Sequence, residues 1–326
     1  MGKKMDVVAL GELLIDMTNN GKSENNNDLF EANPGGAPCN VLAMLKRFDH
    51  SVSFIGKVGD DIFGRKLINT LSEVGIGTDN LLMDPEVRTT LAFVESFADG
   101  DRDFSFYRNP GADMMLKKEE VDVNLLKDTK VFHFGTLSMT HEMPREATLF
   151  AVEEAKKAGA LITFDPNLRE PLWKSLDEAK EQVLCGMKYC DYLKISDNEI
   201  QWLTGEEDYT AGVNKIREQF EIPLITVSMG RDGSRAYYKY GNKEVVTEVK
   251  PFLSDKTIET TGAGDTFCGC VIHYLLEYGI DGLNQKRIEE MLTFANGAAS
   301  LITRVKGALR VMPQISDVEE LIKSRG

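Results

Sequence analysis

The feature that most constrains the fold of this chain is a regular alternation of short β-branched or aromatic runs with amphipathic stretches, which begins near residue 120. The apolar runs lie at 131–134, 161–164, 192–195 and 224–227. The stretches at 145–157, 176–187 and 210–220 repeat apolar residues at helical spacing. Strands that alternate with helices are typical of βα units around a mostly parallel sheet. The pattern therefore predicts an α/β fold with a doubly wound sheet.

The N-terminal part of the chain fits the same sheet. Apolar runs at 7–10 and 52–55 predict two strands, and residues 41–48 place apolar side chains on one face of a helix between them. No internal repeat, low-complexity tract or Pro-rich linker divides the sequence. We therefore expect a single domain over 1–326.

Two stretches interrupt this alternation. Residues 12–34 are largely polar and rich in asparagine, while 90–97 and 102–108 resemble two strands joined by a turn at Asp99-Gly100. Phe106 and Arg108 alternate onto one face of the second strand. Because no helical pattern covers these stretches, we expect a small projecting β-sheet lid, formed by about 12–34 and 88–114, that closes over a ligand. A hairpin without a function is the alternative.

The charge balance excludes some classes of partner. Asp and Glu outnumber Lys and Arg by 52 to 38, which gives a formal net charge of -14. Such a chain repels nucleic-acid phosphates and anionic membrane surfaces, so we expect neither nucleic acid nor a membrane as a partner. No apolar run approaches the roughly 20 residues that cross a bilayer, and no signal-type segment is present, so we expect a cytoplasmic location.

The five cysteines fit a reducing compartment, because their number is odd and they are scattered along a long chain. Cys268 and Cys270 raise the alternative of a zinc site. No C-x-x-C pair or nearby histidine completes a set of four ligands, so we interpret both as small buried side chains.

The most informative segment is E-T-T-G-A-G-D at 259–265, which precedes an apolar helical pattern. Gly262 and Gly264 leave backbone N–H groups uncovered at a helix N-terminus, where anions are stabilised. A carboxylate beside a bound phosphate is repulsive, so Asp265 is better interpreted as a general base that takes a proton from an attacking hydroxyl during phosphoryl transfer. A loop that merely caps a helix is the alternative. The sequence contains neither a P-loop nor a G-x-G-x-x-G helix start.

Two further glycine loops stand in the N-terminal part, P-G-G-A-P-C-N at 34–40 and G-K-V-G-D-D-I-F-G at 56–64. We expect both at sheet edges, where backbone can approach a small polar ligand. Together with D-P-N-L-R at 165–169 and T-T-G-A-G-D, they resemble the PfkB, or ribokinase, family of carbohydrate kinases over nearly the whole chain. Within the family, F-Y-R-N-P-G-A-D-M-M-L at 106–116, D-P-N-L-R-E-P-L-W at 165–173 and K-I-S-D-N-E at 194–199 are similar to bacterial and plant fructokinases.

The resemblance implies a ribokinase-like kinase domain and a role for individual residues. Asp265 would be the general base, and the turn at Gly262, Ala263 and Gly264 would form the anion hole, with Arg169 near the transferred group. The residues implied to bind the sugar are Asp16, Gly35, Gly36, Asn40, Phe106, Arg108, Arg169 and Asp265.

The resemblance also implies a nucleotide and cations. The residues implied to bind ATP are Lys194, Ser228, Gly230, Gly233, Gly262, Gly264, Asn296 and Ser300. Glu199 would organise the Mg²⁺ of Mg·ATP through water. Glu259 and Thr261, with carbonyls in 302–307, correspond to a K⁺ site. Glu259 stands where the family usually has Asp, which leaves potassium dependence open. Ser196 replaces the usual Asn of N-x-x-E, a change that is also found among fructokinases.

The leading hypothesis is transfer of the γ-phosphate of ATP to the 6-hydroxyl of D-fructose. One alternative is a 2-keto-3-deoxygluconate kinase, because two arginines would hold the carboxylate of that substrate well. Another is a catalytically silent protein that binds a sugar or nucleotide and regulates a partner. The alternation of apolar residues in the lid also predicts a homodimer through the lid.

Overall fold

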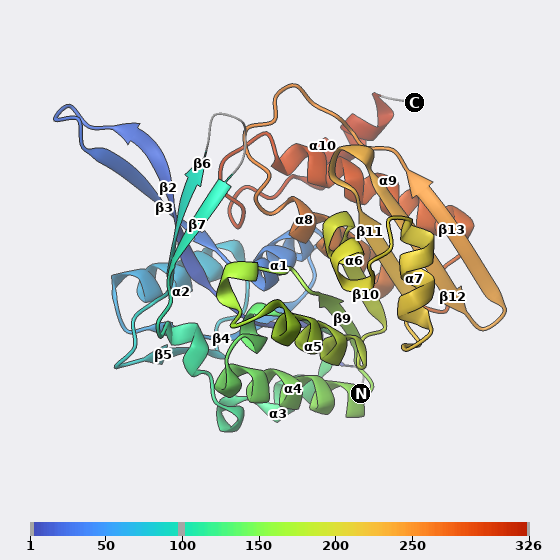
Figure 1. Cartoon of the computed structure of the whole chain (residues 1–326), viewed down its shortest axis with the longest axis horizontal. Coiled ribbons are helices and arrows are strands. Elements are labelled where there is room, and N and C mark those ends of the chain that lie inside the picture. The colour runs from blue at the N-terminus through green and yellow to red at the C-terminus, as the bar shows by residue number, and fades with distance from the viewer. Residues whose placement is uncertain (1–2, 97–101, 325–326) are drawn as a thin grey trace.

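The alternation beyond residue 120 forms the α/β architecture that the sequence predicts, and this expectation is confirmed. The computed structural model describes residues 3–96 and 102–324 (Figure 1). The strands of its large sheet are β1 (Met5–Leu10), β4 (Val52–Gly59), β5 (Leu81–Asp84), β8 (Thr129–Gly135), β9 (Leu161–Asp165), β10 (Tyr192–Ser196), β11 (Leu224–Ser228), β12 (Ser234–Tyr240) and β13 (Lys243–Val249). Their order is β13-β12-β11-β10-β9-β8-β1-β4-β5.

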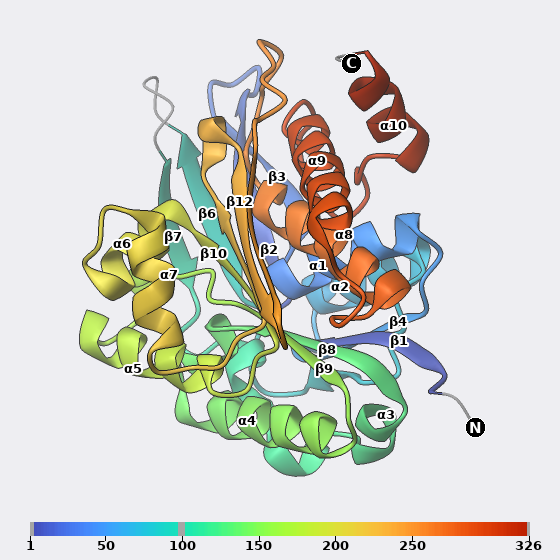
Figure 2. The ribbon, with the colours of Figure 1, turned by 90° about the vertical axis from the view of Figure 1, so that its right-hand side faces the viewer.

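Helices cover both faces of this sheet (Figure 2). One face carries α1 (Ala37–Arg47), α2 (Ile62–Val74), α8 (Ala263–Tyr278), α9 (Gln285–Ile302) and α10 (Ile315–Lys323). The other carries α3 (Val123–Lys127), α4 (Glu142–Lys157), α5 (Leu176–Met187), α6 (Asp197–Thr204) and α7 (Tyr209–Arg217). Two apolar cores result, one on each side of the sheet, which is why the central strands are apolar on both faces.

A second, smaller sheet stands apart from the large one. Its strands are β2 (Leu14–Lys22), β3 (Asp28–Gly35), β6 (Leu91–Ser96) and β7 (Arg102–Tyr107), in the order β3-β2-β6-β7. Figure 1 shows β2 and β3 extending away from the body of the molecule. The outer halves of these two strands are exposed; that of β2 is polar, whereas that of β3 includes Leu29 and Phe30. The expected turn at Asp99-Gly100 lies outside the described residues.

The carboxyl ends of the parallel strands lie at one edge of the large sheet, where ligands bind in doubly wound folds. Asp165 ends β9, Ser196 ends β10 and Ser228 ends β11. Chain segments pass from this edge into the small sheet after β1 and return from it before α1. The fold therefore brings the small sheet and the predicted site residues to the same edge.

Two features of the fold were not expected from the sequence. The antiparallel pair of β12 and β13 closes one edge of the sheet. The loop 56–64 was expected to approach a ligand, but β4 runs on to Gly59 and the segment packs closely instead: a methyl group on Gly64 would lie 1.9 Å from the carbonyl oxygen of Gly59. In the part of the chain that the structure describes, no helix has the length and apolar character needed to cross a bilayer.

Candidate active site

The segment 259–265 forms a turn that leads directly into α8. Gly262, the N-cap residue, has φ 76°, a left-handed conformation that glycine adopts without strain. The first amides of a helix have no acceptor within the helix, and the helix dipole favours an anion beside them. The ammonium group of Lys194 lies beside this turn, since a methyl group on Gly264 would be only 3.1 Å from the Nζ atom. Lys194 therefore adds a positive charge here. This anion turn, residues 260–264, is thus built to hold negative charge.

Asp265 lies in the first turn of α8 and is buried. The Nδ2 atom of Asn40, from α1, donates a hydrogen bond of 2.8 Å to its Oδ2 atom. Burial raises the pKa of Asp265 above its ordinary value, even though the Asn40 hydrogen bond and two nearby cations lower it. A carboxylate with a raised pKa is a better proton acceptor near neutral pH, which is what a general base requires.

A first pocket of about 390 Å³ opens beside Asp265. It is lined by residues of the lid, of the α1 N-terminus and of the strand ends. Of the residues that the resemblance implies for sugar binding, the lining includes Asp16, Gly35, Gly36, Asn40, Phe106, Arg169 and Asp265. The structure therefore brings together residues from opposite ends of the chain.

Asp16 supplies a second carboxylate to the first pocket. Enclosure by the protein raises its pKa to about 7, against the opposing charge of Arg169. Gly35 allows this placement, because a methyl group there would lie 2.3 Å from the Asp16 Oδ2 atom. Carboxylate and amide groups side by side accept and donate hydrogen bonds to neighbouring hydroxyl groups. The chemistry of the first pocket suits a polyol.

A second pocket of about 570 Å³ lies on the other side of the anion turn. Six of the residues expected to bind ATP line it, namely Ser228, Gly230, Gly233, Gly264, Asn296 and Ser300. Phe252 and Phe267 also line it, which gives the pocket flat apolar walls. Asn296 donates hydrogen bonds to the carbonyls of Val249 (3.1 Å) and Lys250 (3.3 Å) and so holds one wall in place.

The two pockets share Thr260 and Gly264 as lining residues. A group held in one pocket therefore meets a group held in the other at the anion turn. Because Asp265 stands at this junction on the side of the first pocket, the arrangement suits transfer of an anionic group between two ligands.

Lys194 and Gly262 were expected beside ATP, but both line the first pocket rather than the second. Lys194 Nζ lies 3.0 Å from Asp165 Oδ2, and both side chains are buried. Burial alone would lower the pKa of Lys194, but Asp165 and Glu199 outweigh burial and raise it. Lys194 is therefore a fixed positive charge at the edge of the anion turn.

Glu199 uses both carboxylate oxygens within the protein. Oε1 accepts the N–H of Leu168 at 2.8 Å, and Oε2 accepts the N–H and the hydroxyl of Ser196, each at 2.8 Å. Burial raises the pKa of Glu199, but Lys194 and these hydrogen bonds outweigh it and lower the pKa. Glu199 lines a smaller pocket of about 310 Å³ that shares Lys194 with the first pocket. An ionised carboxylate with occupied oxygens fits a magnesium ion held through water better than direct coordination.

Glu259 and Thr261 line the first pocket beside Gly307. The N–H groups of Ile258 and Glu259 donate to the carbonyl of Thr303, which ties this segment to the end of α9. The Gly307 N–H donates to Glu259 Oε2 at 3.4 Å. Carboxylate and carbonyl oxygens are the ligands that hard cations prefer, and this segment supplies a carboxylate at the edge of the first pocket. Among the described residues, no three acidic, histidine or cysteine side chains gather as a metal cluster.

Arg108 was expected to reach the sugar, but it is not among the residues that line the first pocket. It is buried in an ion pair with Asp113, at 2.7 Å. Glu12, which lines the first pocket, and Asp113 were both missed by sequence reasoning. Glu12 lies two residues after the end of the buried strand β1 at the ligand-binding edge, and that position was an available signal.

Known proteins of similar sequence cover nearly the whole chain. The chain matches the model of the pfkB family carbohydrate kinases over residues 4–315. Probable fructokinase-4 of Arabidopsis thaliana is 38% identical over 324 residues, which cover 99% of this chain and 98% of that protein. Fructokinase-1 of Zea mays is 38% identical over 319 residues, which cover 97% of this chain and 97% of that protein.

Solved structures show the same fold. Fructokinase from Xylella fastidiosa with bound ATP superposes with a TM-score of 0.87 at 29% identity, covering 98% of each chain. A putative ribokinase II from E. coli in complex with ATP and Mg²⁺ gives 0.84 at 25% identity, covering 98% of this chain and 100% of that one. A fructokinase double mutant from Vibrio cholerae O395, with fructose, ADP and potassium bound, gives 0.81 at 28% identity, with coverage of 99% and 100%.

Proposed function

This chain belongs to the pfkB family of carbohydrate kinases, and on that basis we propose that it transfers the γ-phosphate of ATP to the 6-hydroxyl of D-fructose. The observation that carries the proposal is the junction of the two pockets at the anion turn, with the buried carboxylate of Asp265 beside it. The names of its relatives, which are fructokinases, support the choice of sugar.

The proposed mechanism is an in-line displacement. The sugar occupies the first pocket, with Asp16 and Asn40 orienting its hydroxyl groups, and ATP occupies the second. Asp265 accepts the proton of the 6-hydroxyl as the sugar oxygen forms a bond to the γ-phosphorus. The bond from the γ-phosphorus to the β–γ bridging oxygen breaks, and ADP leaves. The amides of the anion turn and Lys194 stabilise the charge on the transferred group.

Two cations belong to the proposal. Mg²⁺ bound with ATP would neutralise phosphate charge, and Glu199 would hold it through water. K⁺ would be held by Glu259 and by carbonyls near Thr261 and in 302–307. The two segments are brought together by the N–H groups that donate to the Thr303 carbonyl and by the Gly307 N–H, which donates to Glu259. The solved relatives with Mg²⁺ and with potassium support both expectations.

A neutral sugar fits the first pocket better than a keto-acid does. Its charged lining consists of Glu12, Asp16, Glu259 and Asp265, against Arg169 and Lys194. An anionic substrate would meet this excess of negative charge. Arg108, the second arginine that favoured 2-keto-3-deoxygluconate, is already paired with Asp113. A silent regulator is disfavoured because the base and the anion turn are both present.

Initial rates of ADP release with Mg·ATP test the proposal. Fructose, 2-keto-3-deoxygluconate, ribose and glucose are compared, each with K⁺ and with Na⁺. We expect the highest kcat/KM with fructose, because the acidic lining of the first pocket disfavours the keto-acid and the relatives are named fructokinases. We also expect a higher rate in K⁺ than in Na⁺. A preference for the keto-acid would refute the substrate, and binding of ligands without turnover would favour the regulator.

Three finer points are part of the same proposal. Val94 and Phe106 bring the small sheet to the wall of the first pocket, which supports a lid within a single kinase domain.

Leu29 and Phe30 are exposed on β3, which supports a homodimer through the lid. Light scattering would measure the mass of the protein in solution. A cytoplasmic location stays a prediction.

A further inference from the structure

The chain crosses between the large sheet and the lid sheet four times, and the crossings meet at one cluster of buried polar groups. Two crossings, at 11–13 and at residue 36, flank β2 and β3. The other two, at 85–90 and 108–111, flank β6 and β7. We call the cluster the hinge cluster. It consists of Glu12, Thr90, Arg108, Asp113 and Thr140, and each of these residues is buried.

Asp113 is the centre of the hinge cluster. Its Oδ1 atom accepts the hydroxyl of Thr90, the residue before β6. Its Oδ2 atom accepts Nε of Arg108, the residue after β7, at 2.7 Å. The side chains of Arg108 and Asp113 are 3% and 2% exposed, so water does not compete for these bonds. One carboxylate therefore fastens both strands of the second lid hairpin.

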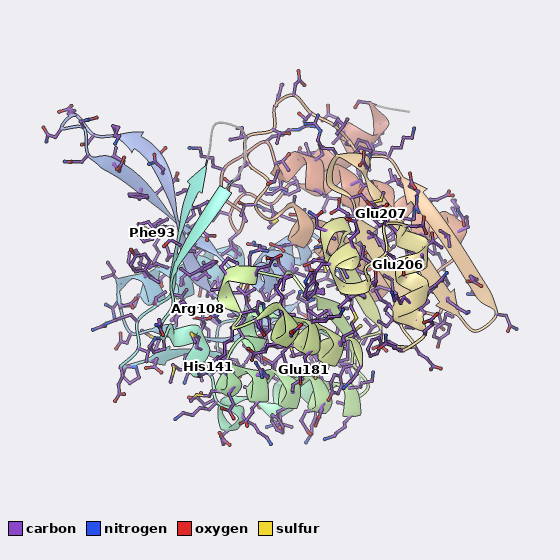
Figure 3. The ribbon with its side chains drawn as sticks, viewed as in Figure 1. Phe93, Arg108, His141, Glu181, Glu206 and Glu207 are labelled. Atoms are coloured by element: carbon purple, nitrogen blue, oxygen red, sulfur yellow. The ribbon has the colours of Figure 1, made fainter. Side chains whose placement is uncertain are left out.

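Arg108 extends the cluster into the body of the molecule. Its Nη1 atom donates to the Thr140 hydroxyl at 2.8 Å, and its Nη2 atom donates to the carbonyl of Leu137 at 3.0 Å. Leu137 lies just beyond β8 and lines the first pocket. Figure 3 shows Arg108 at the foot of the lid strands, with Phe93 farther out along the lid. The lid hairpin is thus bonded to the wall of the site that it would cover.

Glu12 links the other two crossings to the same place. Its Oε1 atom accepts the N–H of Ala37, at the start of α1, with a distance of 2.8 Å. The charges of Asp113 and Arg108 both act on the Glu12 carboxyl group, and burial raises its pKa to about 7. Gly35, the last residue of β3, and Gly36 line the first pocket and directly precede the Ala37 N–H that Glu12 binds.

We propose that the hinge cluster sets the orientation of the lid sheet, and that Asp113 is a positioning residue for phosphoryl transfer because it orders both lid strands through Thr90 and Arg108. The inference rests on the proposed function. Val94 on β6 and Phe106 on β7 line the first pocket, so a displaced lid would loosen the sugar site and admit water. Water would then replace the sugar hydroxyl at the γ-phosphorus, giving ADP and free phosphate.

The test compares substitutions that remove one bond of the cluster with substitutions that keep it. Thr90→Val removes the hydroxyl donor and keeps the shape of the side chain, whereas Thr90→Ser keeps the donor. Asp113→Asn removes the charge of the acceptor. Thr148→Val is the matched control, because Thr148 is a buried threonine in α4 whose hydroxyl bonds only outside the hinge cluster, to Pro144 and Ser138. ADP, sugar phosphate and free phosphate are measured for each protein.

We expect Thr90→Val and Asp113→Asn to raise KM for fructose by about tenfold, the effect of one lost buried hydrogen bond. Both should also raise the share of ADP released without sugar phosphate and leave KM for ATP unchanged. Thr90→Ser and Thr148→Val should match wild type, which separates positioning from a general loss of stability. If Asp113→Asn does not fold, the comparison of Thr90→Val with Thr90→Ser tests the inference by itself.

A folded Thr90→Val protein would overturn the inference if its KM for fructose and its ratio of sugar phosphate to ADP both equalled those of wild type. A wild-type protein that does not phosphorylate fructose would instead refute the proposed function. The two failures are distinguishable, because the first is a ratio between variant and wild type and the second concerns wild type alone. If another sugar is preferred, the same ratios are measured with that sugar.

Discussion

Asp265→Asn is expected to lower kcat with fructose by about 10²–10⁴-fold, the range that a positioned general base contributes. The amide has nearly the shape of the carboxylate and still accepts the hydrogen bond from Asn40, but it cannot take a proton at neutral pH. Binding relies on other groups of the two pockets, so KM for ATP and fructose should change by only a few fold. Steady-state kinetics and thermal unfolding measure these effects.

Asp208→Asn is a matched control for this substitution. Asp208 is also an aspartate at a helix N-terminus, where it caps α7 by accepting the N–H of Ala211. It lines neither pocket, so its kcat should equal that of wild type. An Asp265→Asn protein that is folded and keeps kcat within tenfold of wild type would show that another group accepts the proton.

Lys194→Met is expected to reduce the free energy of unfolding at pH 8 by about 3–5 kcal/mol, because it leaves a buried partner charge uncompensated. Burial already raises the pKa of Asp165 to about 7, even though Lys194 opposes it, and removal of Lys194 raises this pKa further. A carboxyl group with a higher pKa in the folded state binds its extra proton between the unfolded and folded pKa values. Stability therefore falls as pH rises across that window.

The loss in free energy of unfolding caused by Lys194→Met should thus be smaller at pH 5 than at pH 8. Guanidinium unfolding of the variant and of wild type at both pH values measures it. Lys215→Met is the matched control, because Lys215 lies 3.0 Å from Glu206, the same distance as in the buried pair, but both side chains are exposed. We expect it to cost at most about 1 kcal/mol. The double variant Asp165→Asn/Lys194→Met should recover part of the stability. Equal losses at positions 194 and 215 would refute the argument from burial.

The sequence predicts the centre of the sheet better than its borders. The runs at 131–134 and 224–227 lie within β8 and β11, because strands buried on both faces are continuous apolar runs. The edge strands β12 and β13 contain charged and polar residues among their apolar ones and were missed. A turn at Gly241-Asn242 between two β-branched or aromatic runs was a usable signal.

In the candidate site, too, some features can be predicted from local sequence and others cannot. The anion turn could be predicted from seven consecutive residues of sequence, because its chemistry is local. The pairing of Arg108 with Asp113 could not, since alternation along a strand indicates a face but not which side chain a cation will meet. The contact between Asn40 and Asp265 joins residues 225 positions apart, and only the fold brings them together.

The most direct measurement for the central claim is the identity of the product formed from Mg·ATP and fructose, followed by ³¹P NMR. Our account predicts fructose 6-phosphate and ADP in equal amounts, because the sugar hydroxyl beside Asp265 receives the γ-phosphate. Release of ADP with free phosphate alone, or phosphorylation at another hydroxyl of fructose, would contradict it.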